Sequence, residues 1–234
     1  MKCILYSFLT ISMSLSSMAI NIKKFDIDYR EKSKKFGVHM LSGKKDGIRL
    51  YQGTISDVIE RPVEAVLETV LAFDKRCNNE YKDKRQISDK SIDCPYNSDS
   101  LIESVIVKKL KVADLAKNEV NRFIVKRRSY NHGVYTYNDL IRVFRYLDGY
   151  KITMEMLDDT TSKKYISTPL NKKSVMKTSG GTYFILPEGK GKTRYTYTFT
   201  CSTDHWLLNK SITVSKFFSD MAQNLRSEFN TLKK

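Results

Sequence analysis

The stretch WLLNKSITVSKFFSDMAQNLRSEFNTL, residues Trp206 to Leu232, decides the fold that this chain is predicted to adopt. It contains no proline or glycine, and its apolar residues recur at steps of three and four, which places them on one face of an α-helix. At about 1.5 Å per residue the helix would be roughly 40 Å long, so it needs a broad sheet beneath it. Oxygens that could cap its first turn come just before it, from Ser202, Thr203 and Asp204. The apolar face consists of Val214, Phe217, Phe218, Met221, Leu225, Phe229 and Leu232.

A strand of that sheet is predicted immediately before the helix, from Lys192 to Cys201. Tyr195, Tyr197 and Phe199 alternate there with threonine and arginine, the period of two that a half-buried strand shows. The aromatic side chains are expected to face the helix and the threonines to face water. Two interpretations of the aromatic row stay open, namely ordinary core packing and the lining of a ligand chamber between helix and sheet.

Further strands are predicted where valine, isoleucine, tyrosine, phenylalanine and threonine are enriched. Arg61-Pro62-Val63-Glu64 marks the start of a short helix, and Asp148-Gly149 predicts a hairpin turn. Residues 20–45 are expected to form a helical or linker segment, and 112–120 a strand connection or a helical turn. The predicted strands cover residues 48–59, 100–110, 122–130, 134–147, 151–157 and 174–186.

The composition indicates one globular domain with a basic surface. The chain has 234 residues, 41% of them hydrophobic, which is enough for one sizeable core and excludes a disordered chain. Its 41 basic and 26 acidic residues give a net charge of +15, which favours contact with anionic surfaces. No zinc-finger spacing, arginine-rich block or recognition-helix pattern indicates nucleic acid as the partner.

The first residues, Met1 to Ala19, resemble a secretory signal. Lys2 precedes a short apolar run, and Ser17-Met18-Ala19 ends it with small residues. The chain is therefore expected to be exported, periplasmic or secreted, with the segment either cleaved after Ala19 or kept as an anchor. In an oxidising compartment Cys77 and Cys94 are expected to form a disulfide that stabilises the fold by about 3 kcal/mol, which leaves Cys201 as a buried thiol.

Enzyme signatures are absent from the sequence. It contains no Gly-x-Ser-x-Gly elbow, no His-Glu-x-x-His pair and no phosphate-binding glycine loop. Its histidines and cysteines do not have metal-ligand spacing, so neither a metal nor a cofactor is expected, and no catalytic residue is assigned. The charged residues that an enzyme of this fold would have to use, on predicted strands, are Asp139, Arg142, Glu155 and Asp158.

Five stretches in the same order as in START domains give the chain a resemblance to that family, the lipid-transfer branch of the helix-grip (SRPBCC) superfamily. The superfamily also includes polyketide cyclases and the birch-pollen-type (Bet v 1-like) ligand binders. The resemblance covers Lys45 to Leu232, and a START-like ligand-binding domain is expected over residues 46–234. The chain departs from the family at the approach to the last helix, where Asp204-His205 replaces glycine and proline. The five stretches are Asp46 to Tyr51, Arg61 to Leu71, Val120 to Val125, Gly180 to Tyr183 with Gly191 to Tyr197, and Trp206 to Asn209.

The resemblance implies an α+β fold in which a curved antiparallel β-sheet wraps around a long C-terminal helix. It implies a hydrophobic ligand, a lipid above all, held between sheet and helix and either transferred, sensed or stored. Apolar burial alone drives such binding, at about 25 cal/mol per Å². The side chains expected to line the chamber are Tyr183, Tyr195, Tyr197, Phe199, Phe218, Met221 and Leu225.

Two other functions stay open at this point. One is a helix-grip enzyme of the polyketide cyclase or hydrolase type. The other is a protein with a filled interior that docks on anionic membranes through basic runs, although such runs are also ordinary solvated faces. The runs are Lys82 to Arg85, Lys108 to Lys111, Lys126 to Arg128, and Lys163-Lys164.

Overall fold

The structure is a computed structural model that describes residues 22–77, 96–97, 101–111, 115–130, 134–165, 176–205, 208 and 210–233. The predicted signal segment and Cys94 lie outside the described residues. Cys77 is disulfide-bonded, and its pairing with Cys94 stays a prediction. Cys201 is a free and buried thiol, as the sequence predicts. Among the residues given above, no helix has both the length and the apolar character that crossing a bilayer requires.

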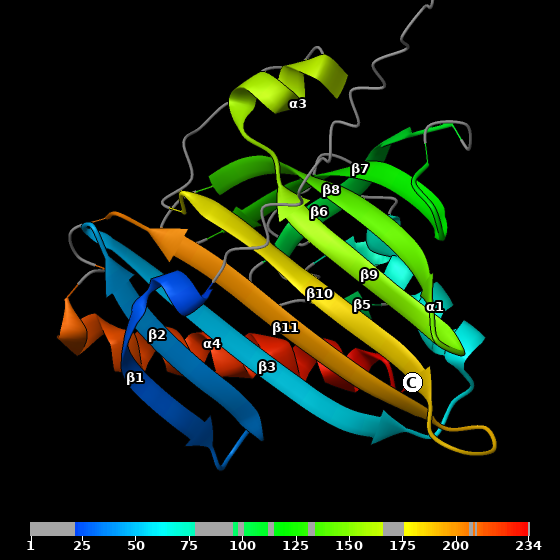
Figure 1. The fold of residues 1–234 in the computed structure, drawn as a ribbon, viewed down its shortest axis with the longest axis horizontal. Coiled ribbons are helices and arrows are strands. Elements are labelled where there is room, and N and C mark those ends of the chain that lie inside the picture. Colours follow the sequence, from blue (N-terminus) through cyan, green and yellow to red (C-terminus); the bar gives the residue numbers. More distant parts are fainter. Residues whose placement is uncertain are drawn as a thin grey trace, which may run out of the picture.

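The described strands form one sheet of 11 strands in the order β1-β2-β3-β11-β10-β9-β8-β7-β6-β4-β5. Neighbours are antiparallel except for the short pair β4 and β5. The sheet curves so that its central strands cross the long helix α4, which lies against one face (Figure 1). The strands are β1 (Asp26–Ser33), β2 (Val38–Lys45), β3 (Ile48–Ile59), β4 (Arg76–Cys77), β5 (Tyr96–Asn97), β6 (Leu101–Lys109), β7 (Glu119–Tyr130), β8 (Val134–Tyr146), β9 (Gly149–Met156), β10 (Thr178–Pro187) and β11 (Thr193–Thr203).

The helices are α1 (Val63–Leu71), α3 (Asp159–Tyr165) and α4 (Ser211–Thr231), with short 3-10 turns η1 (Ile22–Lys24) and η2 (Phe73–Lys75). Helix α4 packs directly on β3, where Gly53 makes the close approach possible. A Cβ atom at Gly53 would lie 2.5 Å from Leu225 Cδ1 and 3.1 Å from Met221 Sδ. The predicted α+β helix-grip fold, a curved antiparallel sheet around a long C-terminal helix, is therefore confirmed.

The N-terminal segment corrects one prediction. The sequence predicts a helix or a linker for residues 20–45, but the described part forms η1 and the hairpin β1–β2, which extends the sheet beyond β3. The turn uses Gly37 in the left-handed region, with φ +64°. Val38, Met40 and Ser42 are buried and alternate with less buried residues, so the period of two outweighs the helical spacing. The domain therefore begins at β1.

The closing helix is shorter than predicted, because it begins at Ser211 and not at Trp206, and Lys210 occupies its N-cap position. The predicted caps Ser202 and Thr203 belong to β11 and pair with Leu50 and Arg49 of β3. Pairing to a neighbouring strand satisfies their backbone groups, so they do not cap a helix.

Two connections also differ from prediction. The β8–β9 hairpin is confirmed, but its turn residues are Leu147 and Asp148, while Gly149 already pairs with Tyr146. A Cβ at Gly149 would lie 2.1 Å from the Ile185 carbonyl oxygen, which explains the glycine. In the described part of 112–120, residues 117–118 form a turn and β7 begins at Glu119, so a strand connection replaces the suggested helical turn. Helix α3 was not predicted.

Candidate functional site

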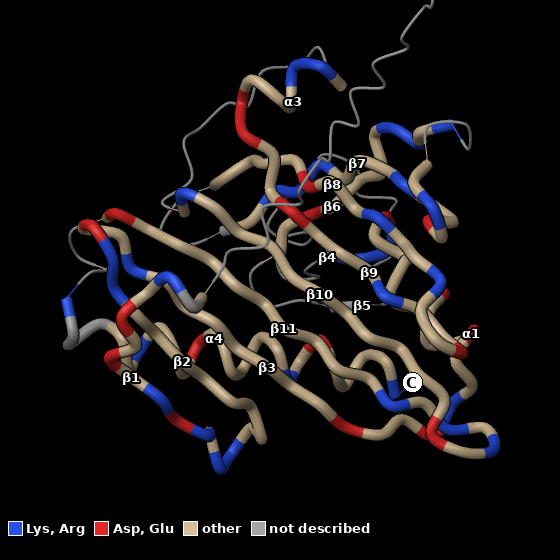
Figure 2. The backbone as a smooth tube through the Cα atoms, viewed as in Figure 1, with Lys and Arg blue, Asp and Glu red and all other residues tan. Residues whose placement is uncertain are grey.

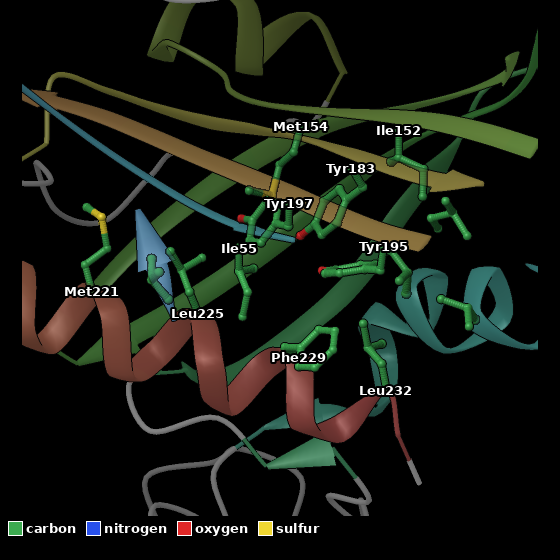
Figure 3. Packing of buried hydrophobic residues seen from close by; sticks show 14 of the residues in the cluster. Ile55, Ile152, Met154, Tyr183, Tyr195, Tyr197, Met221, Leu225, Phe229 and Leu232 are labelled. Carbon is green, nitrogen blue, oxygen red and sulfur yellow. The ribbon is translucent and has the colours of Figure 1, made fainter. Parts of the chain in front are cut away.

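The concave face of the sheet brings together the side chains predicted to line a ligand chamber. Tyr183, Tyr195 and Tyr197 are buried there, and Phe199 packs beside them partly buried. Helix α4 contributes its predicted residues to the same cluster, and Figure 3 shows Met221 and Leu225 among them. The structure thus confirms that the seven residues share one interior, while their contact with a ligand stays a prediction. The residues from α4 are Phe218, Met221 and Leu225.

Within this interior the tyrosines and Phe218 occupy different places. The rings of Tyr183 and Tyr197 stack with centroids 4.0 Å apart, and Tyr195 packs 5.8 Å from Phe229. Phe218 instead stacks on Tyr29 at 4.9 Å, toward the β1 edge of the sheet. Figure 3 shows the hydroxyl groups of the three tyrosines directed into the space between sheet and helix. The tyrosines therefore form the polar part of the interior.

An ion pair that the sequence did not predict lies beside these tyrosines. Arg76 Nη1 lies 2.9 Å from Glu228 Oε1 of α4, and the Tyr183 hydroxyl donates to the same oxygen at 3.2 Å. Arg76 also donates to the Val70 carbonyl oxygen at 2.9 Å, at the end of α1. Glu228 has a sequence signal, because it lies three residues after Leu225 on the buried stripe of α4. The two-residue strand that carries Arg76 gives none.

A second buried ion pair lies on neighbouring strands. Arg127 Nε of β7 is 2.9 Å from Asp139 Oδ2 of β8, and Arg127 Nη2 contacts Met154 Sδ at 3.0 Å. The Arg127 guanidinium also lies over the Phe73 ring, 5.1 Å from its centroid. The sequence held a signal for this pair. Arg127 has the same strand parity as the buried Val125, so the period of two directs it inward.

Two oxygen atoms of this interior lack a hydrogen-bond partner among the described residues. They are the hydroxyl oxygen of Tyr195, whose side chain is 0% exposed, and Oδ1 of Asp139, which is 1% exposed. Burial raises the pKa of Asp139, and the opposing effect of Arg127 offsets only part of this. Burial also raises the pKa of Tyr195 and Tyr197. The tyrosines are therefore protonated at neutral pH and can donate hydrogen bonds.

The outer face of the same strands carries a buried carboxylate with a complete set of partners. Glu119 Oε1 accepts from Arg122 Nε at 2.7 Å and from Arg142 Nε at 3.0 Å. Glu119 Oε2 accepts from Arg142 Nη2 at 3.1 Å and from the Ala116 amide at 2.9 Å. Burial alone would raise the pKa of Glu119, but these hydrogen bonds outweigh it and lower the pKa to about 2. This cluster is complete without any further group.

The residues that an enzyme of this fold would need do not meet. Asp139 faces the interior, whereas Arg142 binds Glu119 on the outer face. Asp158 accepts hydrogen bonds from the Thr161 amide at 2.7 Å and from the Thr161 hydroxyl at 2.9 Å, at the start of α3. Glu155 has the outward parity on β9, because Met154 before it is buried. The four residues therefore do not form one catalytic group.

The predicted basic runs differ in what they do. In the run from Lys126, Arg127 is mostly buried and pairs with Asp139, and Arg128 pairs with Glu103 at 2.6 Å. Lys163 and Lys164 lie on α3, whose last turn they make basic. The run from Lys82 lies outside the described residues. Figure 2 shows basic residues spread along β6 to β9 and α3. In the described part of the chain no group of three or more histidine, cysteine, aspartate or glutamate side chains is placed to hold a metal ion.

Comparisons with known proteins found matches only among solved structures. No protein-family model matches the chain, and no curated protein matches it. The lipid transfer and protein localization domain of human StarD13 is 12% identical, with a TM-score of 0.49, over 87% of this chain and 88% of that one. The STAR-related lipid transfer protein of Xanthomonas axonopodis is 14% identical, with a TM-score of 0.48, over 90% of this chain and 99% of that one.

A third similar structure is an enzyme. The Zhui aromatase/cyclase of a Streptomyces species is 10% identical, with a TM-score of 0.47, over 79% of this chain and 92% of that one. Two of these three similar structures are lipid-transfer proteins by name. At such identities these are likenesses of fold, and the helix-grip arrangement rests on the strand order and closing helix of this chain itself.

Proposed function

We propose that this chain binds a hydrophobic ligand, a lipid with a polar head, between the concave face of the sheet and helix α4, and that it transfers this ligand between membranes. The observation that carries the proposal is the mixed character of the interior. Aromatic and aliphatic side chains lie beside two ion pairs that are buried in large part and beside the unpartnered Tyr195 hydroxyl. An amphiphile has the same two parts, an apolar body and a polar head.

Stability alone does not explain such an interior. Buried ion pairs are commonly no more stabilising than apolar residues of similar volume, because desolvation offsets their attraction. A buried hydroxyl without a partner adds a further cost. Both costs are offset if a bound polar head completes the hydrogen bonds of Tyr195 and Asp139. The apolar part of the ligand would then lie along Met221 and Leu225, and flexible methionine suits varied shapes.

The test is native mass spectrometry of the purified protein, followed by organic extraction and lipid identification. We expect a bound lipid at one per protein, or its uptake from mixed lipid vesicles. Tyr195→Phe should lower its occupancy. The matched control is Thr198→Val, which lies on the same strand but bonds to Thr54 on the outer face at 3.0 Å, and it should leave occupancy unchanged. A protein that stays free of lipid after incubation with vesicles would overturn the proposal.

A second candidate function is acid–base chemistry on the bound ligand. The observation that favours it is the raised pKa of Asp139, a buried carboxyl group that faces the interior. A carboxyl group of this kind is suited to proton transfer. If this function holds, incubation with polyketide-like aromatic precursors gives a product that the Asp139→Asn variant does not form. Unchanged precursors with both proteins would exclude it.

We also propose that the protein is exported and works outside the cytoplasm, in the periplasm or in the medium. The signal-like pattern of Met1 to Ala19 supports this, and so does the disulfide bond of Cys77, since stable disulfides form mainly in oxidising compartments. The intact mass of the protein from its own cells should match a chain that begins at Ile20. Counting thiols on the denatured, unreduced protein should find one, and three would contradict a bridge between Cys77 and Cys94.

A further inference from the structure

An exposed leucine in an unfavourable backbone conformation marks the β8–β9 turn. Leu147 is 76% exposed and has φ +49°. Bulky side chains rarely adopt the left-handed region, because Cβ crowds the following carbonyl group, and an exposed leucine side chain adds nothing to the core. Glycine, asparagine or aspartate would suit this turn better. Neither folding nor solubility explains the leucine.

The side chains around Leu147 are apolar, aromatic and basic. Tyr146 beside it is 42% exposed, and its ring packs 5.3 Å from that of Phe184. The turn before β7 lies alongside, since the Arg145 amide donates to the Asn118 carbonyl oxygen at 2.8 Å. We call this region the tip surface. It consists of Lys117, Val120, Arg145, Tyr146, Leu147 and Lys151.

The charge of the tip surface complements an anionic bilayer. Lys117 and Arg145 are exposed, and Lys151 is partly exposed beside the Phe184 ring, 6.0 Å from its centroid. The one acidic residue within the turn is Asp148. An aliphatic tip flanked by tyrosine and by basic side chains matches the three layers of a membrane surface, which are acyl chains, interface and anionic head groups. Figure 1 shows the turn at the end of the sheet where α1 also lies.

From this we infer that the tip surface docks the protein on anionic membranes by inserting Leu147 among the lipid head groups. The tip surface would be the surface with which the carrier proposed above meets a membrane. It rests on that proposed function only because a carrier must contact membranes. Leu147 and Tyr146 enter the interface, while Arg145, Lys117 and Lys151 attract the anionic head groups. Transfer of the apolar leucine side chain out of water supplies favourable free energy for binding to the membrane, and this gives the strained leucine a function.

The test compares binding to vesicles of phosphatidylcholine alone with binding to vesicles that also contain phosphatidylglycerol, at low and physiological salt. Wild-type protein should bind the anionic vesicles and release them as salt rises. Leu147→Gly should weaken this binding roughly tenfold, because glycine has no apolar side chain to transfer out of water. Glycine relieves the backbone, so the thermal stability of the variant should equal or exceed that of the wild type, and misfolding cannot imitate the result.

Two further variants complete the experiment. Asn118→Gly is the matched control, because Asn118 also has positive φ, at 64°, but contributes no apolar side chain, and it should bind vesicles as the wild type does. Tyr146→Trp in a Trp206→Phe background gives a single tryptophan, whose emission should shift to the blue on anionic vesicles.

The inference is overturned if wild-type protein does not bind anionic vesicles or if Leu147→Gly binds them equally well. Lipid bound in the interior, read by native mass spectrometry, should be the same in wild type and Leu147→Gly, which separates this result from the fate of the proposed carrier function.

Discussion

Two buried carboxyl groups on adjacent strands, Glu119 of β7 and Asp139 of β8, have pKa values shifted in opposite directions. Both are paired with arginine, and both are almost fully buried. Glu119 lies on the outer face, where both of its oxygens accept hydrogen bonds and its pKa is lowered to about 2. Asp139 lies on the concave face with one oxygen unpartnered among the described residues, and its pKa is raised.

The two carboxyl groups therefore differ in their role, since Glu119 serves the stability of the sheet and Asp139 is part of the candidate site. A complete hydrogen-bond network favours the charged carboxylate and stabilises the fold. An incomplete one favours the neutral acid and leaves an acceptor facing the interior. The outer face therefore holds the strands together, while the concave face keeps polar groups whose hydrogen bonds the proposed ligand would complete. The comparison can be tested by substituting residues of the outer face and of the concave face separately.

The largest effect is expected from Glu119→Gln. The change leaves Arg122 and Arg142 with less negative charge between them, so the free energy of unfolding should fall by about 3 kcal/mol. Urea denaturation of the variant and the wild type measures this directly. Ligand occupancy by native mass spectrometry should be unchanged. A loss of under 1 kcal/mol would mean that the network is not structural.

The pH dependence of the free energy of unfolding should reveal the protonation of Glu119. A lowered pKa means that Glu119 stabilises the fold above its ordinary pKa of 4.5, and that this contribution is lost as pH falls toward 2. The loss amounts to about 3 kcal/mol at 1.36 kcal/mol per pKa unit. Denaturation at a series of pH values should therefore show a steeper fall for the wild type than for Glu119→Gln below pH 4.5. Parallel curves would contradict the assignment.

A smaller effect on stability is expected from Asp139→Asn. Asparagine resembles the neutral acid that the raised pKa favours, and Arg127 keeps its position over the Phe73 ring. The free energy of unfolding should change by no more than about 1 kcal/mol. Ligand occupancy should nevertheless fall about tenfold, because asparagine turns its oxygen toward Arg127 and its NH2 group toward the interior, where the ligand then meets a donor in place of the Oδ1 acceptor. Equal losses of stability in Asp139→Asn and Glu119→Gln would remove the distinction between the two faces.

The smallest effect on stability is expected from Tyr195→Phe, which removes a hydroxyl without a described partner. The free energy of unfolding should stay within about 0.5 kcal/mol of the wild type, while ligand affinity falls about fivefold. Tyr183→Phe is the comparison, because its hydroxyl donates to Glu228, and it should cost about 1 kcal/mol of stability. If Tyr195→Phe is the more destabilising of the two, the Tyr195 hydroxyl has a structural partner.

Much of the fold could be predicted because its elements carry clear periods. The alternation from Thr193 to Cys201 fixed the face on which Tyr195 and Tyr197 lie, and the stripe from Val214 to Leu232 fixed the buried side of α4. The segment before β3 was predicted wrongly. A helical or linker segment was expected for residues 20–45, whereas the chain uses Gly37 to turn between two strands.

The candidate site could be predicted only in its apolar part. Periodicity assigned the aromatic residues to the interior, but charged residues on strands usually face water, so Arg127 and Asp139 were not expected there. Their strand parity was the available signal, and it is weaker than the general preference of charges for solvent. Arg76 was beyond sequence reasoning, because its partner Glu228 is far away in the chain.

By itself the sequence determined the hydrophobic and polar faces of the strands and the long closing helix, because these follow from local periods of two and 3.6 residues. Only the tertiary structure decided which buried carboxylate is satisfied and which is not. That depends on where distant strands place arginine, amide and hydroxyl donors, and on a dielectric environment that no local pattern encodes. The same is true of Leu147, whose exposure and strained backbone appear only when β8 and β9 meet.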